Sequence, residues 1–133
     1  MNSYSLPVRV YYEDTDAGGV VYHTGYIRYF ERARTEWLRA LGFSQAKLAE
    51  EVGVLFTVVE LTMRFVKPAR LDDLLQVDAR AETVGGASLL FAQQVTDAAG
   101  DLLADGTVRV ACVDARTLKP RRLPASLAAG LRA

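Results

Sequence analysis

The pattern of hydrophobic and polar positions predicts one long helix near the start of the chain. Between positions 27 and 41, apolar side chains recur every three or four residues, which places them on one face of a helix. This face consists of Ile27, Phe30, Ala33, Arg34, Trp37, Leu38 and Leu41. Arg34 is its only polar member, so we expect it either to reach an acidic group at an interface or to extend to solvent. Thr24 is a suitable N-cap for the helix, and Gly42 is a suitable end.

Alternation of apolar and polar residues predicts one strand before this helix and four strands after it. The first strand covers positions 8–12, and the four later strands lie between positions 53 and 112. The glycine pair 85–86 predicts a hairpin turn between two of them. We also expect a short second helix over 45–51 and a frayed terminal helix over 126–132.

The connections between the later strands are short, which predicts antiparallel pairing, because parallel strands need long crossovers. One long helix against one curved antiparallel sheet is an α+β arrangement of two layers. We find no repeat or linker, so we expect a single domain over residues 1–133. The edges and the second face of the sheet remain to be covered, which favours a homo-oligomer.

Composition and charge narrow the class of protein. The 133 residues carry sixteen Lys and Arg against sixteen Asp and Glu, and this neutral total disfavours a nucleic-acid partner. The single cysteine, Cys112, excludes an internal disulfide and fits a reducing compartment. Residues 1–7 lack the pattern of a signal peptide, and the longest apolar stretch, 52–59, is too short to span a bilayer. We therefore expect a cytoplasmic location and no transmembrane segment.

The segment 11–23 concentrates the side chains that can perform chemistry. It holds Glu13, Asp14 and Asp16, then a pair of glycines, and it ends at the only histidine, His23, where the long helix begins. A helix N-terminus presents unpaired N–H groups and a partial positive charge, which suit an oxyanion or a polarised carbonyl. A carboxylate beside such a site can act as a nucleophile or as a general base.

Other interpretations of this segment also follow from the residues alone. Asp14 and Asp16 could open a calcium-binding loop, but the twelfth position of that template is Gly25 instead of glutamate, so the template fails. One histidine and no neighbouring cysteine leave a hard, oxygen-rich set, so we expect no transition metal. A solvated turn followed by a helix cap remains equally compatible with the composition and spacing.

A family resemblance favours a catalytic role for this segment over a solvated turn. The segment 11–23 (YYEDTDAGGVVYH), with Tyr26 and residues 30–36 (FERARTE), resembles the active-site signature of 4-hydroxybenzoyl-CoA-type thioesterases. It is most similar to the Tol-Pal-associated (YbgC-type) acyl-CoA thioesterases, and the resemblance covers nearly the whole chain, including residues 67–73 (KPARLDD). It implies a hotdog fold, in which a sheet of about five strands wraps a central helix. It also implies dimers with the active site at their interface, often paired into homotetramers.

The resemblance further implies hydrolysis of acyl-CoA to free acid and CoA. Asp16 matches the catalytic aspartate, which acts as a nucleophile or as a general base. The backbone N–H of His23 matches the group that polarises the thioester oxygen, and its imidazole matches a histidine of this subgroup that orients substrate or water. Tyr12 matches a tyrosine near the catalytic loop, although packing at the end of a strand explains it equally well. The expected substrate-binding residues are Gly19, Val20, Tyr26, Lys67 and Arg70. No cofactor is implied.

Coenzyme A carries phosphates, so this activity needs local basic groups. The candidates are Lys67, Arg70, Lys119, Arg121 and Arg122, each of which an ordinary solvated charge explains as well. Relatives carry basic residues in the turn at 84–88, where this chain reads VGGAS, and this departure leaves acyl carrier protein as an alternative carrier. The acyl group depends on which of Leu55, Phe56, Val58, Met63 and Phe65 point inward.

Two other functions remain open from the sequence. A hotdog dehydratase or hydratase would use Asp16 and His23 as an acid and base pair on a 3-hydroxyacyl or enoyl chain. A non-catalytic module would bind acyl carriers without turnover. The loop matches the thioesterase pattern better than either of these.

Overall fold

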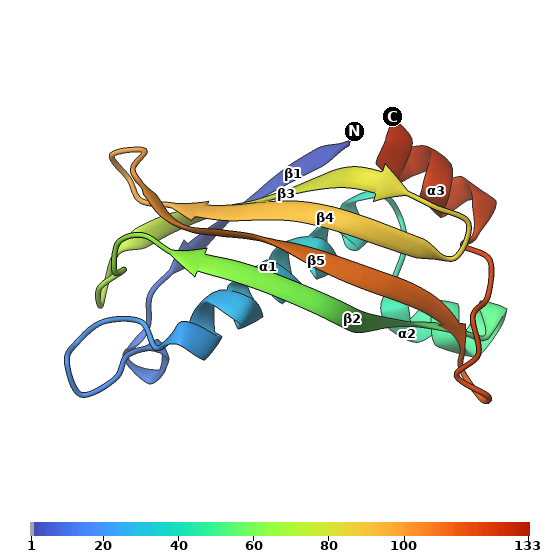
Figure 1. Cartoon of the computed structure of the whole chain (residues 1–133), viewed down its shortest axis with the longest axis horizontal. Helices are drawn as coiled ribbons and strands as arrows, with labels where there is room; N and C mark the ends of the chain where they lie inside the picture. Colours follow the sequence, from blue (N-terminus) through green and yellow to red (C-terminus); the bar gives the residue numbers. More distant parts are fainter. Residues whose placement is uncertain (1) are drawn as a thin grey trace.

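The computed structural model describes residues 2–133, in which five strands and three helices are joined mostly by short connections (Figure 1). The strands are β1 (Ser3–Arg9), β2 (Val54–Phe65), β3 (Leu74–Val84), β4 (Ser88–Thr96) and β5 (Leu102–Asp114). The helices are α1 (His23–Ala40), α2 (Gln45–Lys47) and α3 (Ala125–Arg132). Two further turns are the 3-10 turn η1 (Tyr12–Asp14) and the π-helical turn η2 (Leu48–Val52), which continues α2.

All strands pair antiparallel in one sheet of order β1-β3-β4-β5-β2. The register shifts within β2 at Val58/Glu60, within β3 at Ala81/Thr83 and near the end of β4 at Val95/Thr96. Bulges of this kind bend strands, and the sheet curves around α1 (Figure 1). The sheet therefore has two edges, β1 and β2, and β2 is the longer.

The core lies between α1 and the concave face of the sheet. Tyr29, Phe30, Ala33 and Trp37 of α1 are fully buried, and the ring of Trp37 packs edge-on against Phe91 of β4 with centroids 5.8 Å apart. Burial of each large side chain contributes on the order of 2 kcal/mol. Helix α3 covers the other end of the core with the buried residues Leu127, Ala128 and Leu131.

Most of the predicted arrangement is confirmed. The long helix, the short helix that follows it, the four later strands and the terminal helix all form at the expected places. The inward residues of β4 alternate as expected, because only one face of the sheet packs on the helix. Gly42, with a φ of 93°, follows the end of α1, as its left-handed conformation allows.

The first strand and the start of the long helix differ from the prediction, and β1 begins at Ser3 instead of Val8. The first strand ends at Arg9 instead of continuing to Tyr12, because the chain turns into η1, where the N–H of Asp14 donates to the carbonyl of Tyr11. The interpretation of Tyr12 as a side chain packed at the end of a strand is therefore wrong, because this side chain is 83% exposed. The helix starts at His23 with Tyr22 as its N-cap, so the assignment of Thr24 as N-cap is also wrong.

The concave face is covered unevenly. Helix α1 packs mainly against β1 and β3, at one side of the sheet. At the other side, the edge strand β2 carries exposed apolar residues on both of its faces, Leu55, Val58, Val59, Leu61 and Phe65, followed by Val66. A cavity of about 300 Å³ lies between α1 and β2. No helix of residues 2–133 has the length and apolar character that a membrane crossing requires.

Candidate active site

A tight turn pairs Asp16 with Val20 in the loop that precedes α1. The N–H of Asp16 donates to the carbonyl of Val20 (2.9 Å), and the N–H of Gly19 donates back to the carbonyl of Asp16 (3.0 Å). Gly19 has a φ of 77°, a conformation that glycine adopts without strain. The turn therefore pairs the backbone of Asp16 with Val20, three residues before α1 begins at His23.

The carboxylate of Asp16 is exposed and oriented by one backbone contact. Its Oδ1 atom accepts the N–H of Gly18 at 2.8 Å. Within residues 2–133, its second oxygen accepts no hydrogen bond, so it can face a substrate or a water molecule. A side chain at position 18 would crowd this contact, because an added Cβ would lie 3.2 Å from Oδ1 of Asp16.

The first turn of α1, which begins seven residues after Asp16, presents backbone donors. His23 is the first helical residue, and the N–H groups of a first turn have no preceding helical carbonyl to bind. The imidazole of His23 lies against the ring of Tyr22, with centroids 4.3 Å apart, and near Phe65 of β2 at 6.5 Å. The site therefore combines a carboxylate, unpaired N–H groups and an exposed imidazole at the open end of β2.

Asp14 has a structural position in the same loop. Its carboxylate is only 3% exposed, accepts the N–H of Tyr11 at 2.8 Å and lies 3.8 Å from the guanidinium of Arg28. Burial raises the pKa of Tyr29, and the charge of Asp14 raises this pKa further. The spacing of the acids did not separate Asp14 from Asp16, because it does not reveal which of two neighbouring acids turns inward, whereas the family resemblance selected Asp16.

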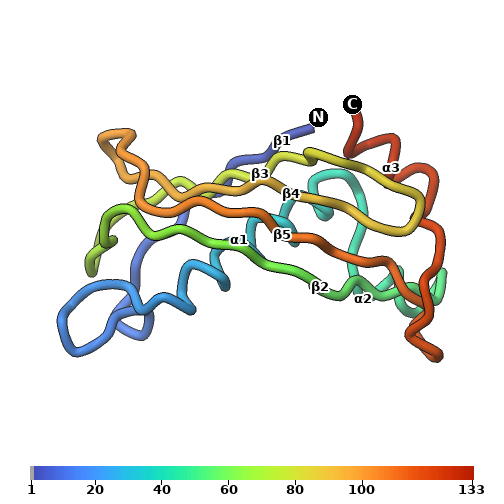
Figure 2. Tube along the Cα trace, viewed as in Figure 1, coloured from blue at the N-terminus to red at the C-terminus, as the bar shows by residue number. Residues whose placement is uncertain are grey.

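The loop is held by the segment that connects β2 to β3. The N–H of Val21 donates to the carbonyl of Ala69 (2.9 Å), and Val20 forms a bridge with Arg70. The trace in Figure 2 shows the two segments side by side at one end of the molecule. Tyr26 is 3% exposed, and its hydroxyl accepts the N–H of Ala69 at 3.0 Å. Tyr26, predicted to bind substrate, is therefore buried, and its hydroxyl fixes the backbone at Ala69.

The basic residues near this loop differ in their availability. The ammonium group of Lys67 pairs with Asp101 at 2.9 Å and with Asp97 at 3.7 Å, and the bond to Asp101 raises the pKa of Lys67. The side chain of Arg70 is exposed and makes no ion pair within residues 2–133. Arg70 is therefore the freer cation beside the Asp16 turn.

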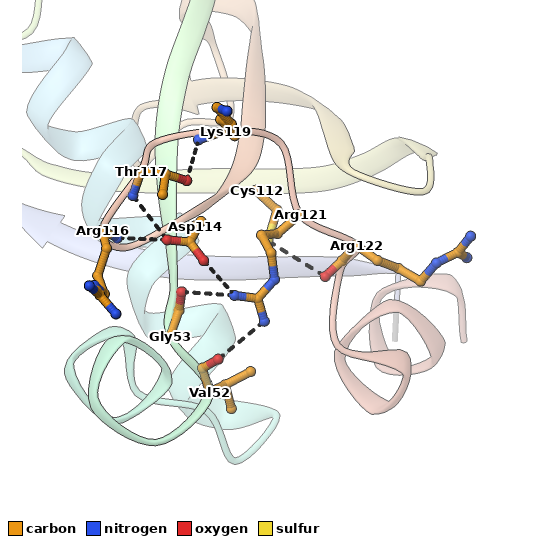
Figure 3. Close-up of polar contacts among 9 residues, drawn as sticks. All are labelled: Val52, Gly53, Cys112, Asp114, Arg116, Thr117, Lys119, Arg121 and Arg122. Atoms are coloured by element: carbon orange, nitrogen blue, oxygen red, sulfur yellow. Dashed lines mark hydrogen bonds and ion pairs between the residues drawn. The ribbon is translucent and has the colours of Figure 1, made fainter.

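The other predicted cations lie at the opposite end of α1, near α3 and α2 (Figure 1). Figure 3 shows that Arg121 donates to Oδ2 of Asp114 (2.9 Å) and to the carbonyls of Gly53 and Val52 (3.3 Å each). Arg121 therefore joins the C-terminal segment to η2. The description of Arg121 as an ordinary solvated charge is wrong, whereas Lys119 and Arg122 are exposed.

Arg34 and Gln93 form a partly buried polar contact that the helix pattern did not reveal. The guanidinium of Arg34 donates to Oε1 of Gln93 at 2.9 Å, and Gln93 donates to the carbonyl of Phe30 at 3.1 Å. Burial lowers the pKa of Arg34. The signal for this partner was present in the sequence, because Gln93 is a polar residue at an inward position of an otherwise apolar strand face.

No group of three or more His, Cys, Asp or Glu side chains that could hold a metal ion occurs in the described chain, residues 2–133.

Comparison with known proteins identifies the class to which this fold and site belong. Residues 10–131 match the model of the thioesterase-like superfamily, and the chain belongs to this family. The acyl-CoA thioester hydrolase YbgC of Escherichia coli O6:H1 is 50% identical over 123 residues, which are 92% of this chain and 91% of that protein. The acyl-CoA thioesterase YbgC of Haemophilus influenzae is also 50% identical, over 92% of this chain and 90% of the relative.

A solved structure supports the same assignment. The DHNA-CoA thioesterase of Staphylococcus aureus superposes with a TM-score of 0.86 at 28% identity, over 92% of this chain and 82% of that chain. The α+β arrangement of a helix wrapped by five antiparallel strands is therefore the hotdog fold, as the sequence resemblance implied.

Proposed function

We propose that this protein hydrolyses acyl-CoA thioesters to free acid and CoA, with Asp16 as the catalytic carboxylate. The observation that carries this proposal is the exposed carboxylate of Asp16, fixed by the N–H of Gly18 in the loop that precedes α1. The similarity of this chain to the YbgC relatives, which are acyl-CoA thioesterases by name, also supports this activity.

Two routes are compatible with this arrangement. In the nucleophilic route, an oxygen of Asp16 attacks the thioester carbon, the C–S bond breaks, and water hydrolyses the resulting anhydride to release the acid. In the general-base route, Asp16 takes a proton from water, the water oxygen attacks, and the proton passes to the leaving thiolate. The thiol of the leaving group has an ordinary pKa of about 8.5, so its thiolate can leave without a dedicated acid to protonate it.

The N–H of His23 is suited to bind the thioester oxygen. Negative charge develops on this oxygen in either route, and a helix N-terminus stabilises it through unpaired N–H groups. Loss of one such donor typically lowers the rate by about 10²–10³. The exposed imidazole of His23 would orient the substrate or water. Tyr12, also exposed, lies in the turn before the catalytic loop and is free to contact substrate.

A second copy of the chain would complete the site. Strand β2 is a long edge strand with exposed apolar side chains, and such an edge favours pairing with another strand. Phe65, which neighbours His23, lies at the end of this edge. Pairing of two β2 strands would therefore bring the candidate site to the dimer interface. Pairing of two dimers would then give the homotetramer that the family resemblance implies.

The nucleotide end of the substrate needs cations near the Asp16 turn. Arg70 is the best placed, because its side chain is exposed and its backbone pairs with Val20. The ion pairs of Lys67 with Asp97 and Asp101 would have to open before it could bind phosphate. Acyl carrier protein remains the alternative carrier. The free thiol of Cys112 and a CoA-linked substrate favour a cytoplasmic location.

The test is release of free thiol from a panel of short, long, branched and aromatic acyl-CoAs. Asp16→Asn should lower kcat at least 10³-fold, whereas Glu13→Gln, a matched exposed acid in the same loop, should stay within about twofold. Equal activity of Asp16→Asn and the native chain would refute the role of Asp16. Consumption of enoyl-CoA without thiol release would identify a hydratase, and binding without turnover across the panel would identify a carrier-binding module.

A further inference from the structure

Residues 14–22 form a small hairpin with Asp16 near its tip. At the base of this hairpin, the carbonyl of Asp14 accepts the N–H of Tyr22 at 3.0 Å. Nearer the tip, the N–H of Asp16 donates to the carbonyl of Val20 at 2.9 Å. An antiparallel bridge lies between these two bonds. The position of Asp16 therefore depends on what holds the base of the hairpin.

The base of the hairpin is also the start of α1. Tyr22, which bonds to Asp14 there, is the N-cap of α1, and His23 is the first residue of this helix. The N–H groups of a first helical turn are unpaired, and the proposed function uses one of them to bind the thioester oxygen. The angle at which the hairpin leaves α1 therefore sets the position of Asp16 relative to these donors.

Asp14 is the acid of the hairpin whose side chain is buried. It is 3% exposed and, with Gln93, is one of two buried polar or charged residues of the described chain, whereas Asp16 is exposed. Its Oδ2 atom accepts the N–H of Tyr11, the N-cap of η1, at 2.8 Å. A carboxylate loses its hydration on burial, which offsets much of the stability that such a bond adds. What the bond does fix is the path of the chain into the hairpin.

The same carboxylate faces α1. Its Oδ1 atom lies 3.8 Å from the guanidinium of Arg28. Burial raises the pKa of Tyr29, the next residue of α1, and the nearby charge of Asp14 raises this pKa further. The carboxylate of Asp14 therefore lies between the chain that enters the hairpin and the second turn of α1, and it interacts with both.

We propose that Asp14 is a positioning residue, whose buried carboxylate holds the base of the hairpin against α1 and thereby places Asp16 for catalysis. This inference rests on the catalytic role of Asp16 in the proposed function. A displacement of about 1 Å at a reacting group can lower a rate about 10²-fold. Loss of the Asp14 carboxylate should therefore lower kcat even when the chain stays folded.

Three substitutions of Asp14 test this role, with thiol release from acyl-CoA as the assay. Asp14→Ala removes the acceptor, and Asp14→Leu fills the buried site without an acceptor. Each should lower kcat about 10²-fold and leave KM within about threefold of native. Asp14→Asn keeps one oxygen that can accept the N–H of Tyr11, so its kcat should stay within about tenfold of native.

Trp37→Phe is the matched control for a loss of stability alone. Trp37 is a fully buried residue of α1, and its indole N–H makes no hydrogen bond in the described chain, so this substitution removes packing but no bond. It should lower the urea midpoint of unfolding and leave kcat within about twofold of native. If Asp14 served stability alone, its folded variants would behave like this control.

The outcomes separate this inference from the proposed function. Folded Asp14→Ala or Asp14→Leu chains with native kcat overturn the inference, and so does a rise in KM without a fall in kcat, which would assign Asp14 to substrate binding. If only one of the two variants folds, that variant decides. If neither folds while Asp14→Asn does, Asp14 serves the fold alone, and the inference is again overturned. Full activity of Asp16→Asn would overturn the proposed function and this inference together.

Discussion

Gly106 is the position at which one added carbon should most disturb the edge that forms the candidate site. It lies on β5 opposite Met63 of β2. A Cβ added there would lie 2.0 Å from the carbonyl oxygen of Thr62 and 3.0 Å from Cα of Met63. These are backbone atoms, so no side-chain rotation relieves the clash, and β2 has to move away from β5.

The cost of Gly106→Ala follows from this movement. Overpacking costs about 1–3 kcal/mol, and each backbone hydrogen bond lost between the strands adds about 1 kcal/mol. With two such bonds lost near Thr62 and Met63, the free energy of unfolding should fall by about 3–5 kcal/mol. This is a large part of the roughly 5–15 kcal/mol that stabilises a typical domain.

Urea unfolding followed by circular dichroism measures this change, with Gly86→Ala as the matched control. Gly86 lies in the turn between β3 and β4, where an added Cβ meets no atom within 4 Å. The free energy of unfolding of the Gly86→Ala variant should differ from that of the native chain by less than about 0.5 kcal/mol. An equally small change for Gly106→Ala would show that β2 and β5 are not packed at this position as described.

Three further predictions concern the loop and the C-terminal turn. Tyr26→Phe removes the acceptor of the buried Ala69 N–H and should lower the free energy of unfolding by about 1–3 kcal/mol in urea titrations. Asp14→Ala should destabilise the chain by about 1–3 kcal/mol in the same assay, because the N–H of Tyr11 loses its carboxylate acceptor. The pKa of Asp114 is about 2, below its ordinary 3.8. It is lowered by hydrogen bonds from the N–H groups of Thr117 and Arg116 and from the guanidinium of Arg121. Its stabilisation is thus complete above about pH 4 and is lost as the pH falls towards 2, so Asp114→Asn should flatten the loss of urea midpoint over that range.

The sequence predicts those elements whose burial is one-sided. The alternation in β4 and the helical period of α1 report which face is buried, and both elements form where that pattern places them. Strand order depends on pairing between distant segments, so the pattern does not reveal that β2 pairs with β5 and leaves one edge open. For the same reason, the local pattern extends the first strand to Tyr12, where hydrogen bonds to Asp14 instead turn the chain.

In the candidate site too, the local sequence pattern does not reveal contacts between side chains from distant segments. The family resemblance selects Asp16 and His23, and the structure has His23 as the first residue of α1 and Asp16 in the exposed turn that precedes it. It does not distinguish Lys67, which pairs with Asp101 across 34 positions, from the unpaired Arg70. Such contacts join segments that are far apart along the chain, and local composition carries no trace of them.

The bonding of the Asp16 turn to residues 69–71 has a consequence for protein engineering. Val21 and Val20 take their backbone partners from Ala69 and Arg70, so the loop is one half of a two-piece unit. A graft of residues 11–23 alone into another hotdog scaffold would transfer the carboxylate without the segment that holds the loop in position. A chimera that exchanges residues 67–73 together with residues 11–23 should therefore carry over the geometry of the turn, whereas either piece alone should not.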